Sequence, residues 1–128
     1  MANLLTKFST EIEELKKNQN IQSIILFGSY STGKIKPLSD LDICIITTKK
    51  ATKKAKTEIL SNGTDEFDLS LFENLPLSLQ FKILTTGKIL HTTKDLSQLK
   101  RITMNQWFDF RPIINRLYQS RGYPQIKI

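Results

Sequence analysis

Two aspartates, Asp40 and Asp42, lie two positions apart at the start of the apolar run Leu-Asp-Ile-Cys-Ile-Ile. In a β-strand, side chains at this spacing share a face, so both carboxylates would project from one side. Two carboxylates this close repel each other unless a cation lies between them. Mg²⁺ prefers hard oxygen ligands and binds together with phosphate groups. The pair therefore predicts a magnesium site for a phosphorylated substrate.

A dipeptide suited to phosphate binding, Gly28-Ser29, follows the apolar run 24–27, and ten residues separate it from Asp40. The apolar run predicts a short buried strand, and its end would offer backbone N–H groups and a hydroxyl to a phosphate. Ser39 either contacts phosphate as well or forms a turn before the second strand. For Gly28-Ser29 to meet the aspartates, the first strand must end beside the start of the second. We therefore predict that these strands are antiparallel.

A third carboxylate, Asp68, lies between Phe67 and Leu69 in a segment that alternates polar and apolar residues. This alternation predicts a strand, and a strand parallel to the second would bring Asp68 onto the face of the aspartate pair. Three carboxylates, two metal ions and a triphosphate match the two-metal scheme of phosphoryl transfer. In that scheme Asp68 could also accept the proton of the attacking hydroxyl.

The glycine-rich segment nearly spells a Walker A loop, Gly-x4-Gly-Lys, over residues 28–34. The residue after Lys34 should then be Ser or Thr, whose hydroxyl binds Mg²⁺, but it is Ile35. Pro37 also prevents the long helix that such a loop must begin. We therefore do not favour a P-loop fold.

The elements that must position these residues alternate along the chain. Helices are expected at residues 3–18, 49–60, 76–86 and 95–121, and strands at 24–27, 41–48, 66–72 and 88–91. This order predicts one α/β domain over residues 1–128, with a core at about 1–92 and a C-terminal helical extension at about 95–121. Pro112 predicts a kink or a break of the last helix near Phe110.

Composition excludes several classes of protein. The 128 residues are 39% hydrophobic and 24% charged, as in an ordinary globular domain. The lone Cys44 cannot form an internal disulfide and is expected to be a small, partly buried filler rather than a nucleophile. The chain carries no 18-residue apolar run and no signal-peptide pattern, so we expect a cytoplasmic protein without a membrane segment.

The net charge of +7 suggests an anionic partner. Lysines gather in the run 49–56, which could be a nucleic-acid stripe or a solvated helix face. We prefer the solvated face because the run has no interleaved aromatics and no nucleic-acid-binding motif, and nucleic-acid binding stays open.

The segment from Ile24 to Phe72 resembles the polymerase-beta-like nucleotidyltransferase superfamily. The resemblance rests on an apolar residue before Gly28-Ser29, on the Asp-x-Asp pair ten residues later, and on Asp68 one strand further on. The longer string Gly-Ser-Tyr-x-x-Gly-x5-Ser-Asp-Leu-Asp and the chain length are similar to those of minimal nucleotidyltransferases. The resemblance implies a small mixed sheet flanked by helices.

The same resemblance implies ATP-dependent transfer of a nucleotide with two Mg²⁺ ions. Asp40, Asp42 and Asp68 would be metal ligands and catalytic residues, and Gly28, Ser29, Lys34 and Ser39 would bind the nucleotide. Lys34 is included in the nucleotide-binding set because Ser31-Thr32 replaces the Ala-Arg of many relatives. Lys34 lies near enough in the sequence to supply the missing positive charge.

The resemblance also implies a partner. Many minimal nucleotidyltransferases are antitoxins that transfer AMP to a tyrosine of a HEPN-type RNase toxin. A small molecule or an RNA 3′ end is an alternative acceptor, and a module that acts by contact alone is an alternative function. The aromatics Trp107, Phe108 and Phe110 cannot all face one side of a helix, so an exposed apolar surface for a partner or a homodimer is expected.

Overall fold

The computed structural model describes residues 6–28, 41–64 and 66–120. Its elements are α2 (Ser9–Lys16), β1 (Ile21–Phe27), β2 (Leu41–Thr47), α4 (Lys53–Leu60), β3 (Phe67–Leu71), the 3-10 helix η1 (Phe72–Asn74), α5 (Leu77–Thr86), β4 (Lys88–Thr92) and α6 (Ser97–Ser120). This order confirms the predicted α/β class.

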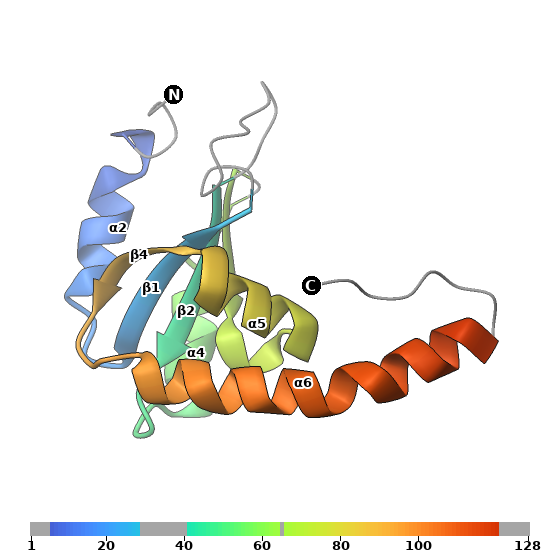
Figure 1. The fold of residues 1–128 in the computed structure, drawn as a ribbon. Helices are drawn as coiled ribbons and strands as arrows, with labels where there is room; N and C mark the ends of the chain where they lie inside the picture. Colours follow the sequence, from blue (N-terminus) through green and yellow to red (C-terminus); the bar gives the residue numbers. More distant parts are fainter. Residues whose placement is uncertain (1–5, 29–40, 65, 121–128) are drawn as a thin grey trace.

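The four strands form one mixed sheet in the order β3-β2-β1-β4 (Figure 1). β1 pairs antiparallel with both β2 and β4, whereas β2 and β3 run parallel. The antiparallel first pair and the parallel third strand confirm the directions predicted from the chemistry. β4 lies at the edge next to β1, as expected for its short sequence.

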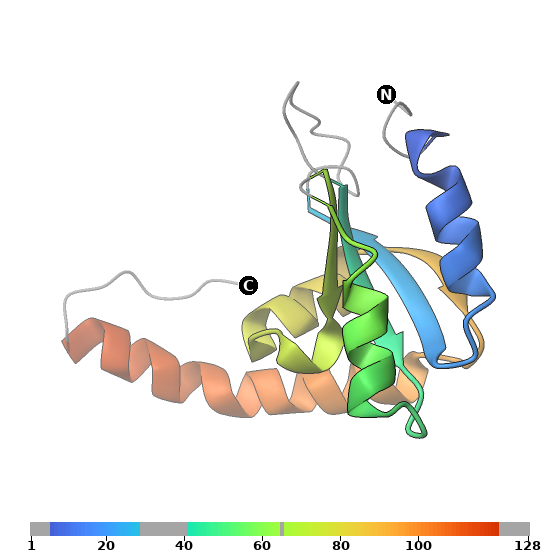
Figure 2. The ribbon, with the colours of Figure 1, turned by 180° about the vertical axis from the view of Figure 1, so that it is seen from behind.

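Helices cover both faces of the sheet, which explains why β1 and β2 each contain four consecutive buried residues. One face packs Ile24 and Ile43 against Ile12 of α2 and Ile59 of α4. The other packs Ile25, Cys44 and Ile46 against Ile83 of α5 and Leu96 just before α6. Figure 2, seen from behind, shows α4 in front of the sheet and α6 beyond it.

Two helices differ from their predicted ranges. The predicted helix at 49–60 begins at Lys53, because the Thr52 side chain accepts a hydrogen bond from the backbone N–H of Ala55 and caps it. The predicted helix at 3–18 is interrupted by a turn at Phe8: residues 6–7 and Ser9–Lys16 are helical, and residues 3–5 lie outside the described residues. The Phe8 ring stacks on Phe67 at a centroid distance of 4.8 Å.

The last helix is continuous through Pro112, so a break near Phe110 was a wrong prediction. Proline removes only one helical hydrogen bond, and the remaining turns hold the helix together as it curves gently in Figure 1. The Asp95 carboxylate accepts hydrogen bonds from the hydroxyl and the backbone N–H of Ser97, and these bonds lower the pKa of Asp95. Over the described ranges, no helix has the length and hydropathy to cross a membrane.

Candidate active site

One end of the sheet brings together the end of β1 and the starts of β2 and β3, at the top of Figure 1. The register pairs Phe27 with Asp42, and Asp42 with Asp68. The backbone N–H of Leu41 donates to the carbonyl of Glu66 at 2.8 Å and fixes the start of β2 beside the segment that leads into β3. Asp42 therefore lies in the middle strand, flanked by both neighbours.

Asp42 and Asp68 lie on the face of the sheet that α5 and α6 cover. Leu41 and Ile43 belong to the core on the opposite face, so Asp42 between them points the other way. Asp68 is exposed between the buried Phe67 and Leu69, which belong to that same opposite core. Register partners on adjacent strands lie about 4.8 Å apart, so the two carboxylates project side by side.

Gly28 fits tightly against this pair. Its φ is 78°, a left-handed conformation that non-glycine residues rarely adopt. A Cβ at this position would lie 2.5 Å from Oδ2 of Asp42, too close for two non-bonded atoms. A side chain here would therefore strain the backbone and displace the Asp42 carboxylate.

Four of the predicted site residues, Ser29, Lys34, Ser39 and Asp40, lie outside the described residues. Gly28, Asp42 and Asp68 lie within them and meet at one end of the sheet. Within the described residues, no group of three or more His, Cys, Asp or Glu side chains could hold a metal ion.

The chemistry of the described donors still fits a hard cation. Asp42 and Asp68 are like charges on directly opposed positions, an arrangement that is unfavourable without a cation between them. Both carboxylates offer only oxygen atoms as ligands, and oxygen is the ligand atom that Mg²⁺ prefers. Asp68 is exposed, so a large substrate could reach it.

Cys44 lies two residues after Asp42 on the same face, but it is fully buried in the core under α5. Burial raises the pKa of its thiol to about 12, so the thiol stays protonated at neutral pH. The prediction of a small filler rather than a nucleophile is confirmed, although Cys44 is fully and not partly buried.

Sequence reasoning missed one polar neighbour of the pair. Ser70 lies two residues after Asp68 on the same face, is the register partner of Cys44 and is only partly buried. The Asp-x-Ser spacing in a strand was the signal that could have identified it.

The family model for polymerase beta nucleotidyltransferases matches residues 10–96. This range covers most of the chain and includes Gly28, Asp42 and Asp68. The chain belongs to this nucleotidyltransferase family. The described site residues thus lie inside the matched segment, at the end of the sheet that β1, β2 and β3 share.

Known proteins similar to this nucleotidyltransferase-family chain fall into two groups. A protein of Methanocaldococcus jannaschii that is proposed to be a protein adenylyltransferase is 33% identical over 67 residues, which are 52% of each chain. The chain thus spans about half the length of this curated relative.

Solved structures of toxin–antitoxin systems share the fold. A crystal structure of a toxin–antitoxin with AMP-PNP superposes with a TM-score of 0.60 at 23% identity, over 87% of this chain and 92% of the matched one. A structure of a tri-AMPylated HEPN toxin of Shewanella oneidensis in complex with an MNT antitoxin has a TM-score of 0.60 at 22% identity, over 88% and 97%. These likenesses confirm the mixed sheet with flanking helices.

Proposed function

We propose that this chain transfers AMP from ATP to a hydroxyl of a partner protein, a HEPN-type RNase toxin, in a Mg²⁺-dependent reaction. The observation that carries the proposal is the register that sets Asp42 between Gly28 and Asp68 at the end of the sheet. Family membership supports nucleotidyl transfer. The M. jannaschii relative and the complex with a tri-AMPylated HEPN toxin support a protein acceptor.

In this proposal the site residues divide into metal ligands and nucleotide-binding residues. Asp40, Asp42 and Asp68 would hold two Mg²⁺ ions, and Gly28, Ser29, Lys34 and Ser39 would bind the triphosphate. When bound, the ions offset the negative charge of the triphosphate and lower the pKa of the acceptor hydroxyl. Gly28 keeps the space beside Asp42 free of a side chain, so the Asp42 carboxylate stays where the nucleotide binds.

The proposed reaction is an in-line displacement at phosphorus. The acceptor hydroxyl oxygen forms a bond to the α-phosphorus of ATP, the bond from that phosphorus to the β-phosphate oxygen breaks, and pyrophosphate leaves. The Asp68 carboxylate accepts the hydroxyl proton. Because Asp68 is exposed whereas Asp42 is partly buried, we assign proton transfer to Asp68 and nucleotide positioning to Asp42.

The test first isolates the proteins that co-purify with this chain and then uses the protein together with a HEPN-type protein among them. With Mg²⁺ and ATP labelled at the α-phosphate, the partner should become labelled, and mass spectrometry should locate one or more AMP groups on tyrosine. ATP labelled at the γ-phosphate should leave the partner unlabelled, since pyrophosphate departs. Absence of labelling from α-labelled ATP would contradict the proposal.

Gly28→Ala should slow nucleotidyl transfer by about 100-fold, because the added Cβ forces the Asp42 carboxylate away and small misplacements at a site are this costly. The left-handed φ should also cost about 1–2 kcal/mol of unfolding free energy. Transfer rates and thermal melting measure the two effects.

Gly63→Ala is the matched control for Gly28→Ala. It makes the same chemical change in the turn after α4, at a glycine without positive φ. A Cβ there would lie 3.2 Å from the carbonyl oxygen of Phe67, a tight contact without the 2.5 Å overlap found at Gly28. Its transfer rate should stay within about twofold of the wild type. Equal rates for the two variants would refute the role given to Gly28.

A further inference from the structure

Cations gather at the end of the sheet opposite the candidate site. The register pairs Ile21 with Thr47 and Ser23 with Thr92, so the start of β1 and the ends of β2 and β4 share this end. Backbone hydrogen bonds of 2.9 Å from Thr48 to Asn20 and from Thr93 to Gln22 join the adjoining segments. Segments far apart in sequence thus form one surface.

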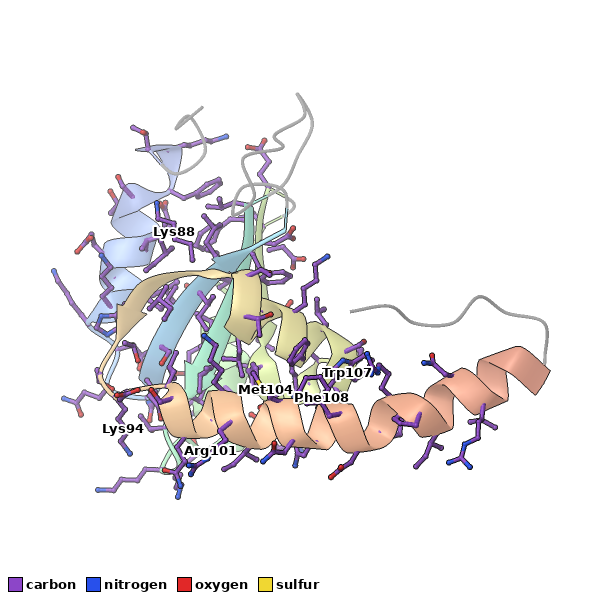
Figure 3. All side chains as sticks on the ribbon, viewed as in Figure 1. Lys88, Lys94, Arg101, Met104, Trp107 and Phe108 are labelled. Carbon is purple, nitrogen blue, oxygen red and sulfur yellow. The ribbon has the colours of Figure 1, made fainter. Side chains whose placement is uncertain are left out.

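Exposed lysines and an arginine cover this surface. We call the set the basic end, and it comprises Lys17, Lys49, Lys50, Lys53, Lys54, Lys94, Lys100 and Arg101. In Figure 3, Lys94 and Arg101 lie at the lower left, far from the upper end of the sheet. Within the part of the chain that the structure describes, none of the set forms an ion pair with a carboxylate, whereas the nearby Lys56 pairs with Glu73 at 2.7 Å.

The basic end is too far from the candidate site to bind the triphosphate there. β2 has seven residues, and at about 3.3 Å per residue it separates the two ends by about 20 Å. Charges in solution are screened over about 8 Å at physiological ionic strength. The proposed reaction therefore leaves this concentration of positive charge unexplained.

The composition of the basic end indicates the class of its partner. Lysine is depleted in protein–protein interfaces, which instead concentrate aromatic side chains and arginine. Interfaces with nucleic acids are far more positively charged, and their lysines contact phosphates. The exposed aromatics Phe108 and Phe110 lie further along α6, so the basic end lacks the stacking platform that single strands need.

We propose that the basic end binds the phosphate backbone of a nucleic-acid duplex without reading its sequence. This surface adds to the proposed nucleotidyl transfer and is separate from it. The cations come from the end of α2, from the turn and bend segments after β2 and β4, and from the first turns of α4 and α6, so they can follow a backbone rather than enter a groove. This proposal departs from the sequence-based preference for a solvated helix face, because Lys94, Lys100 and Arg101 extend the exposed lysine run.

The test measures the binding of fluorescent 20-base-pair RNA and DNA duplexes of unrelated sequences over a range of salt concentrations. Wild-type protein should bind both sequences equally, with affinity that falls steeply with salt. The variant K49Q/K50Q/K94Q changes only turn and bend positions. It should bind at least about tenfold more weakly, and its salt slope should be smaller by about one for each phosphate that a lysine no longer neutralises.

The matched control, K82Q/K88Q/R116Q, removes the same charge from exposed positions outside the basic end and should stay within about twofold of the wild type. Comparison of the two affinities would show whether the duplex that the basic end binds is RNA or DNA. Equal weakening by the two variants, no duplex binding by the wild type, or equally tight binding to polyglutamate would overturn the proposal, the last in favour of an acidic protein. Because the readout is binding, its failure is distinguishable from a failure of AMP transfer.

Discussion

Asp42→Asn should reduce AMP transfer by on the order of 10³-fold while the chain stays folded. The substitution keeps the size of the side chain and removes its charge, so the Mg²⁺ that would bind the triphosphate loses a carboxylate ligand, and such an ion contributes several kcal/mol to the transition state. Asp68→Asn should cost on the order of 10²- to 10⁴-fold, because it also removes the proton acceptor. Rates of partner labelling measure both losses.

Stability measurements separate a catalytic role from a structural one. Asp42 and Asp68 are like charges at register positions on adjacent strands, so removing one charge relieves their repulsion. We therefore expect Asp68→Asn to melt at the same temperature as the wild type or slightly above it when Mg²⁺ is absent. Glu58→Gln, the same loss of charge at an exposed position of α4, should leave the labelling rate unchanged. Full activity in Asp68→Asn would refute the assignment.

The strand directions at the site could be predicted because chemistry and topology constrain each other there. Gly28 can meet Asp42 only if β1 and β2 are antiparallel, and Asp68 can join them only if β3 is parallel to β2. The alternation around Asp68 fixed the face of its side chain. These local patterns needed no knowledge of the rest of the fold.

Other features depend on contacts that no local pattern records. Thr52 caps α4 only because the chain turns after β2, so the helix begins four residues later than lysine content suggested. Pro112 would end an isolated helix, yet α6 continues through it. The basic end combines Lys17, Lys49 and Lys94, which only the sheet register brings together.

The predicted exposed apolar surface also needed the structure to be located. Trp107 is 3% exposed and packs against Phe81, whereas Phe108 and Phe110 are 45% and 41% exposed. Ile113 and Leu117 are also exposed, and with Phe110 they follow a helical i, i+3, i+7 spacing. These three residues form an apolar stripe on the half of α6 that projects beyond the sheet in Figure 1.

The double variant Phe110→Glu/Ile113→Glu should weaken binding of the HEPN-type partner by about 100-fold or more, because each large apolar side chain buried at an interface contributes about 1.5–3 kcal/mol. Both residues are exposed, and glutamate is a good helix former, so the melting temperature should change little. Calorimetric titration with the partner measures the loss.

The control Gln98→Glu/Asn105→Glu adds the same charge to α6 at exposed polar positions and should bind the partner normally.

A variant with an intact stripe also distinguishes neutralisation by AMP transfer from neutralisation by contact. If the partner is neutralised by AMP transfer, an Asp42→Asn variant with an intact stripe should still bind it and yet leave its RNase active. If contact alone suffices, that variant should suppress the RNase fully. A stripe variant that changes only the oligomeric state of this chain would instead identify a homodimer contact.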